Sequence, residues 1–146
     1  MNTAQTLFED ADIISTYTRA DAIEDGELVD VTEAARETGF RYPIAITRAA
    51  WEDCCSWTDA DAERKPRTHQ DERGRLHDVL WMAFLAAKYS KYARVAYENA
   101  AIRHFDLYRV PVHGKGERPR RTTLKMVCGP GDNAEPVITI MLPDED

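Results

Sequence analysis

The last third of the chain alternates between apolar and polar residues in three separate segments. Their apolar residues are Phe105 and Leu107 near 102–110, Leu124, Met126 and Cys128 near 122–128, and Ile138, Ile140 and Leu142 near 136–142. Since successive side chains of a strand point to opposite faces, this period predicts three strands, each with one apolar face. The turn signal Gly129-Pro130-Gly131-Asp132-Asn133 predicts that the last two form a hairpin. The chain must therefore supply a layer that covers one face of a sheet.

A long amphipathic segment at about 72–90 precedes these strands. Its apolar residues recur at the spacing of one helix face: Leu76, Val79, Leu80, Ala83, Phe84 and Ala87. Trp81, Met82 and Leu85 widen the apolar arc, so the pattern predicts a central, mostly buried helix. Residues 91–101 are expected to extend this helix or to form a short helix of their own.

Capping residues mark two shorter helices in the N-terminal half. The first is expected at 31–38, with Asp30 as the N-cap, Glu33 at the capping-box position and Gly39 as the left-handed residue that ends it. The second follows Thr47, a typical N-cap. Its shared apolar face contains Ala50, Trp51, Cys54 and Cys55.

The segments around these helices give weaker signals. A helical turn at Arg19–Glu24 is expected to stop at Asp25-Gly26, and the extended run Phe40–Ile46, with Pro43 near its start, predicts a short edge or first strand. The polar residues Asp59–Gly74 are interpreted as a long loop.

Together these elements predict an α+β fold in one domain, residues 1–146. The sheet is expected to be antiparallel, with three to four strands, and packed on one face by about three helices. The longest apolar cluster, Val79–Ala87, is too short to span a bilayer, and the N-terminus lacks the pattern of a secretion signal. Three cysteines, of which only Cys54 and Cys55 are adjacent, suit reduced thiols. The sequence therefore predicts a cytoplasmic protein.

Charges of opposite sign are concentrated in different parts of the chain. Residues 1–60 contain thirteen acidic and four basic side chains, residues 61–130 contain eight acidic and fifteen basic ones, and residues 131–146 contain five acidic and none basic. Such blocks create local fields that influence partner choice and association rate. The acidic block is interpreted as a surface for binding a basic partner, unless it is only a solvated face or is neutralised by the cationic middle. Its predicted contact residues are Asp10, Asp12, Asp21, Glu24, Asp25 and Glu27.

The cationic middle supplies a weaker candidate for anion binding. Its candidate residues are Lys88, Lys91, Arg94, Lys115, Arg118, Arg120 and Arg121. Cations alternate with tyrosines from Lys88 onward, a pattern that can follow a phosphate backbone, although the end of an amphipathic helix also has it. The net charge of −7 and the pI near 5.1 weigh against direct nucleic-acid binding through residues 88–121.

No motif predicts a catalytic, metal or cofactor site. The histidines lack metal-ligand spacing, nothing near Cys54-Cys55 activates a thiol, and the glycines of His113–Arg121 lack the context of a phosphate loop. An enzyme acting on RNA or a phosphorylated ligand is a secondary hypothesis. It would use Arg103, His104, Arg109, His113 and Lys125 on the C-terminal sheet, although alternation directs Arg103 and His104 to opposite faces.

Three segments carry a resemblance to a known family. They are TYTRADAIEDGELVDVTEAARETGFRYPIAITRAAW, QDERGRLHDVLWMAF and LKMVCGPGDNAEPVITIMLPDED. The chain resembles a family of short bacterial proteins of unknown function that are carried mainly on plasmids and other mobile elements. It departs from the family at KYSKYARVAYENAAIRHF, which is longer than expected. The family has no established activity, so the resemblance assigns no catalytic residue.

The resemblance implies a context for the acidic block. Accessory genes on mobile elements often encode small acidic inhibitors of host defence, which is an association and not a mechanism. The leading hypothesis is a non-enzymatic interaction module, an anti-CRISPR-like inhibitor that binds a basic protein or nucleoprotein complex of the host. A homodimeric structural protein, in which the opposite charge blocks pair between subunits, is the third hypothesis.

Overall fold

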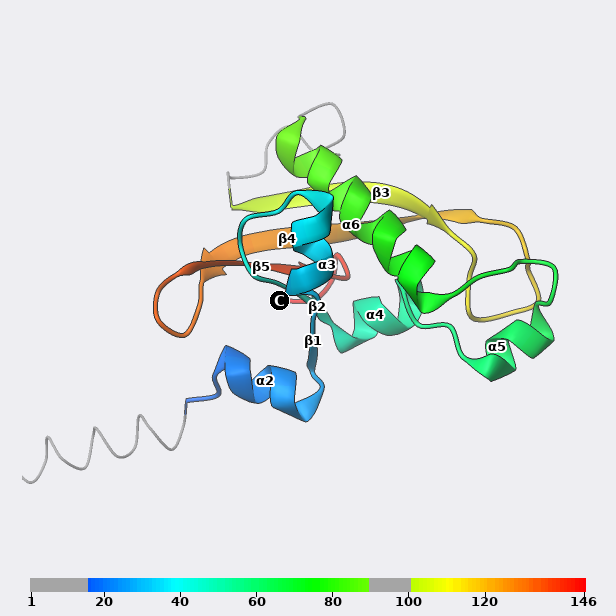
Figure 1. Cartoon of the computed structure of the whole chain (residues 1–146), viewed down its shortest axis with the longest axis horizontal. Coiled ribbons are helices and arrows are strands. Elements are labelled where there is room, and N and C mark those ends of the chain that lie inside the picture. Colours follow the sequence, from blue (N-terminus) through cyan, green and yellow to red (C-terminus); the bar gives the residue numbers. More distant parts are fainter. Residues whose placement is uncertain (1–15, 90–100) are drawn as a thin grey trace, which may run out of the picture.

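The computed structural model describes residues 16–89 and 101–146, which form an α+β fold (Figure 1). The strands are β1 (Leu28–Asp30), β2 (Ile44–Thr47), β3 (Ile102–Arg109), β4 (Arg120–Pro130) and β5 (Pro136–Met141). The helices are α2 (Arg19–Asp25), α3 (Thr32–Thr38), α4 (Arg48–Cys54), α5 (Asp59–Arg64) and α6 (Glu72–Lys88). The class matches the prediction, but the predicted architecture does not.

The sheet is mixed and has five strands in the order β1-β2-β5-β4-β3. β2 and β5 are parallel, and the other neighbouring pairs are antiparallel. The prediction of an antiparallel sheet with three to four strands is therefore wrong. β1 has only three residues, too few for an alternating pattern to be visible. The parallel pairing joins Ile44 to Ile138, and no local pattern encodes a contact between such distant segments.

β2 lies inside the sheet, so its assignment as an edge or first strand is also wrong. Ile44, Ala45 and Ile46 are all buried. Ile44 and Ile46 belong to the core cluster, and Ala45 lies near α2, with which it lines a small pocket. A strand that is buried on both faces loses the alternation that identifies its orientation. Pro43 lies just outside the strand, where its carbonyl accepts a hydrogen bond from the Ile138 amide at 2.9 Å.

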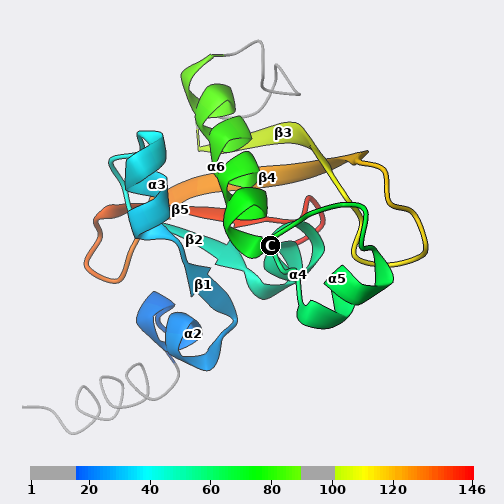
Figure 2. The ribbon, with the colours of Figure 1, turned by 45° about the vertical axis from the view of Figure 1, so that its right-hand side comes forward.

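Helices α3, α4 and α6 lie on one face of the sheet, as the two views show (Figures 1 and 2). α6 packs against β3, which confirms the central helix predicted from its apolar face. The core between the layers includes Ala35, Ile44, Ile46, Val79, Leu80, Ala83, Phe105, Leu124 and Ile140. Apart from Ala101, the alternatives left open for residues 91–101 lie outside the described part. None of the described helices has the length and apolar character needed to cross a membrane.

Two further helices raise the number above the three that were expected. α2 corresponds to the predicted turn at Arg19–Glu24 and ends at Gly26, which has a φ of 80°. α5 occupies part of the segment interpreted as a loop. Thr58 begins α5 through a capping box in which its hydroxyl accepts from the Asp61 amide and the Asp61 carboxylate accepts from the Thr58 amide. This short helix has no apolar period, and its capping box uses Asp in place of the usual Glu or Gln.

Thr47 caps α4 as predicted, but the predicted cap of α3 is wrong. Val31 occupies the N-cap position and makes no side-chain cap bond, while the Asp30 carboxylate accepts from the Thr32 amide at 3.0 Å and hydroxyl at 2.6 Å. Gly39 ends α3 as expected, with a φ of 129°. A Cβ there would also lie 2.9 Å from the Phe84 ring, so both conformation and packing favour glycine.

Candidate interaction surfaces

Acidic side chains gather on α2 and directly after it. Asp21, Glu24 and Asp25 are spaced at i, i+3 and i+4, so they share one face of the helix, and Glu27 follows the cap at Gly26. All four acidic residues are exposed. Asp10 and Asp12, the remaining members of the predicted set, lie outside the described residues.

Local contacts involve two of the three acidic residues on α2. Asp21 forms a capping box with Thr18 in the first turn. Glu24 and Asp25 lie in the last turn, where the helix dipole disfavours negative charge and where α2 has no basic residue to offset them. Asp25 accepts a hydrogen bond from the Tyr17 hydroxyl, and the Arg48 guanidinium donates to the Asp25 and Gly26 carbonyls at this end of the helix. The stability of α2 therefore does not account for Glu24.

The attachment of α2 brings acidic residues from the C-terminal hairpin to the same region. The Asp132 carboxylate accepts from the Arg19 amide at 2.8 Å and the Ala20 amide at 3.0 Å, and the Arg19 guanidinium reaches the Ile138 carbonyl at 2.8 Å. A pocket of about 170 Å³ beside Arg19 is lined by Asp30, Asp132 and Glu135. The acidic surface therefore consists of Asp21, Glu24, Asp25, Glu27, Asp30, Asp132 and Glu135. Asp30 belongs to the acidic block of the sequence but was not among the predicted contact residues. Asp132 and Glu135 were missed because only the tertiary fold brings them to α2.

The Tyr17 phenol responds to the negative potential at this surface. Its hydroxyl donates to Asp25 Oδ2 at 2.8 Å. This hydrogen bond, followed by desolvation and by the charges of Asp25, Glu27 and Asp21, raises the pKa of Tyr17 to about 12.

The cationic middle of the chain does not neutralise α2. Among the described residues, the acidic side chains of α2 and Glu27 form one ion pair, between Glu27 Oε1 and Arg48 Nη2 at 3.3 Å. Arg48 belongs to the N-terminal block itself. A cation from the middle does pair with that block elsewhere, because Arg109 Nη2 contacts Asp53 Oδ1 on α4 at 3.1 Å.

The structure does not bring the predicted anion-binding residues together. Lys115, Arg118, Arg120 and Arg121 are exposed in the β3–β4 loop, residues 110–119, and at the start of β4. Lys88 ends α6 near the opposite end of β3 and lies 5.6 Å from the centroids of the Phe84 and Tyr89 rings. Lys91 and Arg94 lie outside the described residues. In Figures 1 and 2 the β3–β4 loop and α2 lie at opposite ends of the sheet, so the two charges are separated in space.

Lys65 fixes the shape of the β3–β4 loop from beneath. Its side chain is 1% exposed, and its Nζ donates to the Pro111 carbonyl at 2.5 Å and the Gly116 carbonyl at 2.7 Å. Burial lowers the pKa of this ammonium group. Lys65, a cation of the middle block, thus supports from the interior the loop that carries Lys115 and Arg118.

The residues of the enzyme hypothesis do not form one site. Arg103 faces α6, where it donates to the Ala86 carbonyl at 3.3 Å, and Arg109 faces α4. His104 pairs with Lys125 across the strands, and Lys125 donates to the Glu145 carbonyl near the C-terminus. Arg103 and His104 therefore point to opposite faces, as alternation predicted. Cys54 offers no nucleophile either, because burial raises its pKa to about 12.

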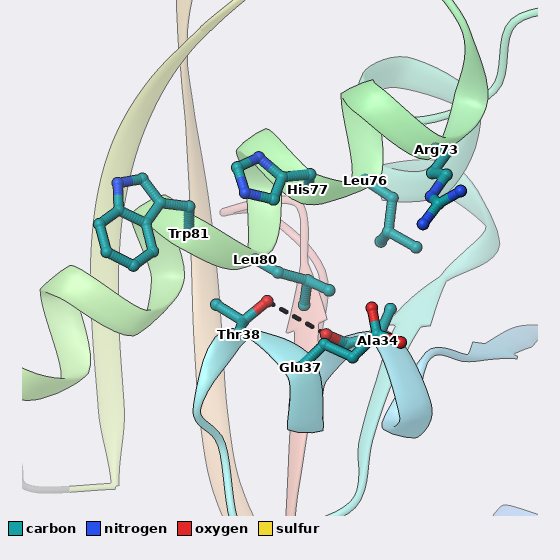
Figure 3. A pocket seen from close by; sticks show the side chains of 8 residues that line it. All are labelled: Ala34, Glu37, Thr38, Arg73, Leu76, His77, Leu80 and Trp81. Carbon is teal, nitrogen blue, oxygen red and sulfur yellow. Dashed lines mark hydrogen bonds between the residues drawn. The ribbon is translucent and has the colours of Figure 1, made fainter.

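A groove of about 340 Å³ lies between α3 and α6 (Figure 3). Ala34, Glu37 and Thr38 line it from α3, and the α6 residues facing it are Arg73, Leu76, His77, Leu80 and Trp81. Trp81 is 43% exposed and stacks on Phe84 with a centroid distance of 6.0 Å. An exposed tryptophan beside aliphatic side chains is typical of protein-binding surfaces. Sequence analysis had assigned Trp81 only to the apolar arc of the helix.

Comparison with known proteins places the whole chain in one family. Within the described residues, no group of three or more His, Cys, Asp or Glu side chains is arranged to hold a metal ion. No curated protein and no solved structure matches the chain. A model described as a family of unknown function, DUF6573, matches residues 2–146. Because this match spans nearly the whole sequence, the chain belongs to DUF6573, a family of unknown function.

Proposed function

We propose that this chain is a non-enzymatic protein-interaction module that binds a basic protein through its acidic surface. The supporting observation is the pair Glu24 and Asp25, exposed in the last turn of α2, where they oppose the helix dipole and have no cation beside them in that turn. Exposed carboxylates that oppose the helix dipole, and that are separated from the cationic loop, suit electrostatic attraction of a partner.

The partner class we favour is a nucleic-acid-handling complex of a host cell. Its nucleic-acid groove is lined by cations, and a row of carboxylates can occupy such a groove in place of phosphates. The resemblance to proteins of mobile elements favours the finer proposal of an inhibitor of host defence, such as a CRISPR effector. The α3–α6 groove with Trp81 supports the broader proposal, because it offers an apolar anchor that an electrostatic contact alone lacks.

A charge-reversal pair tests this function. Affinity capture from the native host, followed by mass spectrometry, identifies the partner, and binding is then measured with Glu24→Lys/Asp25→Lys. The matched control is Glu52→Lys/Glu63→Lys, which changes the net charge equally at exposed positions on α4 and α5. We expect the α2 variant to lose the partner and the control to retain it.

Salt dependence supplies the second readout. Binding of the captured partner is expected to weaken as salt rises from roughly 50 to 300 mM, since screening shortens the range of charge interactions. An affinity that is independent of salt, or equal losses in both variants, contradicts the proposal. Recovery of a basic DNA- or RNA-handling complex would support the finer proposal.

Self-association is a second candidate, because the acidic surface and the cationic β3–β4 loop lie at opposite ends of the same sheet (Figure 1). Two copies can then place unlike charges against each other. Light scattering at low salt is expected to show a dimer in that case. Monomers at every concentration would end this alternative and leave the first proposal unaffected.

A further inference from the structure

The end of the β3–β4 hairpin carries an excess of positive charge. Its four cations, Lys115, Arg118, Arg120 and Arg121, are all exposed. None of them forms an ion pair within the part of the chain that the structure describes. The loop at 110–119 contains one acidic residue, Glu117, which is only partly exposed. Because the acidic surface lies at the opposite end of the sheet (Figure 1), the net charge of −7 does not describe the field at this end.

The loop of this hairpin has its carbonyls directed toward the interior. Side chains of α5, α6 and the residue after α5 donate to five of them, and the donors are Arg64, Lys65 and Arg75. The accepting carbonyls belong to Val110, Pro111, Val112, His113 and Gly116. The shape of the loop is therefore fixed from the side of the core.

The backbone amides of the same loop make no such bonds. No amide from Val112 to Arg118 donates to an acceptor within residues 16–89 and 101–146. A Cβ placed on Gly114 or Gly116 would meet no atom within 4 Å, so this stretch of backbone borders open space. Since the carbonyls are engaged and the amides are not, N–H dipoles on the outer side of the loop add to the charges of its cations. The outer side of the loop is thus arranged to attract anions.

An exposed tyrosine lies beside these cations. Tyr108 on β3 is 67% exposed, more than any other large hydrophobic side chain among the described residues. It pairs with Arg121 of β4, and paired residues of antiparallel strands share one face of the sheet. Leu107 packs in the core on the α6 side, so alternation places Tyr108 and Arg121 on the other face. Asp106, two residues along that face, accepts from the Thr123 hydroxyl at 2.6 Å.

We propose that the end of the β3–β4 hairpin binds single-stranded nucleic acid. Its cations and loop amides contact phosphates, and Tyr108 stacks on a base. Three of the four cations are arginines, whose planar donors match phosphate oxygens. A cationic surface with an aromatic side chain suits single strands, because an unpaired base can leave its neighbours and stack on the ring. This binding does not depend on the acidic surface, which lies at the other end of the sheet.

Fluorescence anisotropy with the full chain tests this binding directly. The labelled probes are oligouridine RNA and oligothymidine DNA of about 12 nucleotides, a DNA duplex of the same length, and polyglutamate as an acidic polypeptide. We expect both single strands to bind more tightly than the duplex and polyglutamate. Contacts with roughly three or four phosphates predict a slope of about −2 to −3 for log affinity against log salt. Tighter binding of RNA identifies RNA as the ligand, and tighter binding of DNA identifies DNA; both support the site.

Single substitutions then locate the binding face. Tyr108→Ala should weaken single-strand binding by roughly fivefold or more. Arg121→Gln should weaken it about threefold or more at low salt and make the slope less steep by about 0.7. The matched control is Arg120→Gln, which removes the same charge one position away. Arg120 pairs with Arg109, whose contact with Asp53 places both on the helix side, so the control should lose less than about twofold.

All three substituted positions are exposed, so the variants are expected to fold. The proposal is overturned if the duplex or polyglutamate binds as tightly as the single strands. Equal losses in Arg121→Gln and Arg120→Gln overturn it as well, because they indicate general attraction of polyanions. An affinity unchanged in Tyr108→Ala has the same consequence. None of these results bears on the acidic surface, which Glu24→Lys/Asp25→Lys tests separately.

Discussion

The acidic residues of α2 remain in solvent, whereas several cations of residues 61–130 are taken into the interior. Glu24 and Asp25 are exposed and form no ion pair within the described residues, but Lys65 and Arg75 are 1% and 3% exposed. Long basic side chains can bury an apolar stem and donate to backbone carbonyls, whereas ionised carboxylates have no proton to donate to a carbonyl. The acidic block therefore leaves more of its charge on the surface than the basic block does.

This difference in burial says more about where charge acts on the protein than the net charge of −7 does. The cationic block supports the protein from within, through Lys65 under the β3–β4 loop and Arg109 against Asp53. In the acidic block, Asp21, Asp30 and Asp53 make local or tertiary contacts, whereas Glu24 and Asp25 stay exposed on α2. Four substitutions test this division of roles, beginning with the interior.

Lys65→Met should have the largest effect on stability. It leaves the Pro111 and Gly116 carbonyls without their buried donor, and we expect the free energy of unfolding to fall by roughly 2–4 kcal/mol. Urea denaturation measures the loss. Lys115→Met, in the exposed part of the same loop, should change stability by less than about 0.5 kcal/mol. Equal effects of the two substitutions would show that Lys65 is not an internal support.

Cys54 should make the folded state sensitive to alkaline pH. Burial raises the pKa of its thiol from 9.0 to about 12, so the folded state keeps a proton that the unfolded chain loses. The stabilisation is therefore complete below about pH 9 and is lost as pH rises toward 12. The urea midpoint at pH 7, 9 and 10.5 measures this decline. Cys54→Ala should reduce its slope, and an unchanged slope would assign the decline to other groups.

Tyr17 should report the potential of the acidic surface. In a spectrophotometric titration, the difference between the wild type and Tyr17→Phe should give a phenol with a pKa of about 12. Asp25→Asn weakens the hydrogen bond that contributes most and removes the charge of the same residue, so this pKa should return toward 10. A Tyr17 that titrates normally in the wild type would mean that the carboxylates of α2 do not act together.

Substitution of Glu24 should have the smallest effect on the free energy of unfolding. The sign of that effect is informative. Glu24→Gln removes a charge that opposes the helix dipole, so the free energy of unfolding should rise by roughly 0.3–0.5 kcal/mol. Asp21→Asn, in the first turn of the same helix, should lower it by a similar amount, because it weakens the capping box. Thermal melts compare the two variants. If Glu24→Gln were destabilising, the acidic surface would have a structural role.

Elements with a long local pattern or a clear capping signal were predictable, and two of the shortest elements were not. α6 follows from its apolar face, and β3, β4 and β5 follow from alternation, including the hairpin at Gly129–Asn133. β1 and α5 are too short to show a period. β2 was predicted as a strand, but not as an inner strand that pairs in parallel with β5.

Some residues of the candidate sites were likewise predictable from the sequence, and others depend on the tertiary fold. Asp21, Glu24, Asp25 and Glu27 could be proposed because they are close in sequence and form a cluster of one charge. Asp132 and Glu135 could not, because their place beside Arg19 depends on the hairpin reaching α2. Arg75 has the pattern of an ordinary polar residue of an amphipathic helix, and only the tertiary structure shows its burial against Trp57.

The sequence by itself determined the helix-capping positions at Thr47 and Gly39, the apolar face of α6 and the alternation of the three C-terminal strands. These features arise from interactions among residues a few positions apart, so a short window contains their cause. The tertiary structure alone decided the parallel pairing of β2 with β5 and the burial of Lys65 and Arg75. Both depend on distant segments meeting, because a strand needs a partner and a buried cation needs acceptors that no single segment supplies.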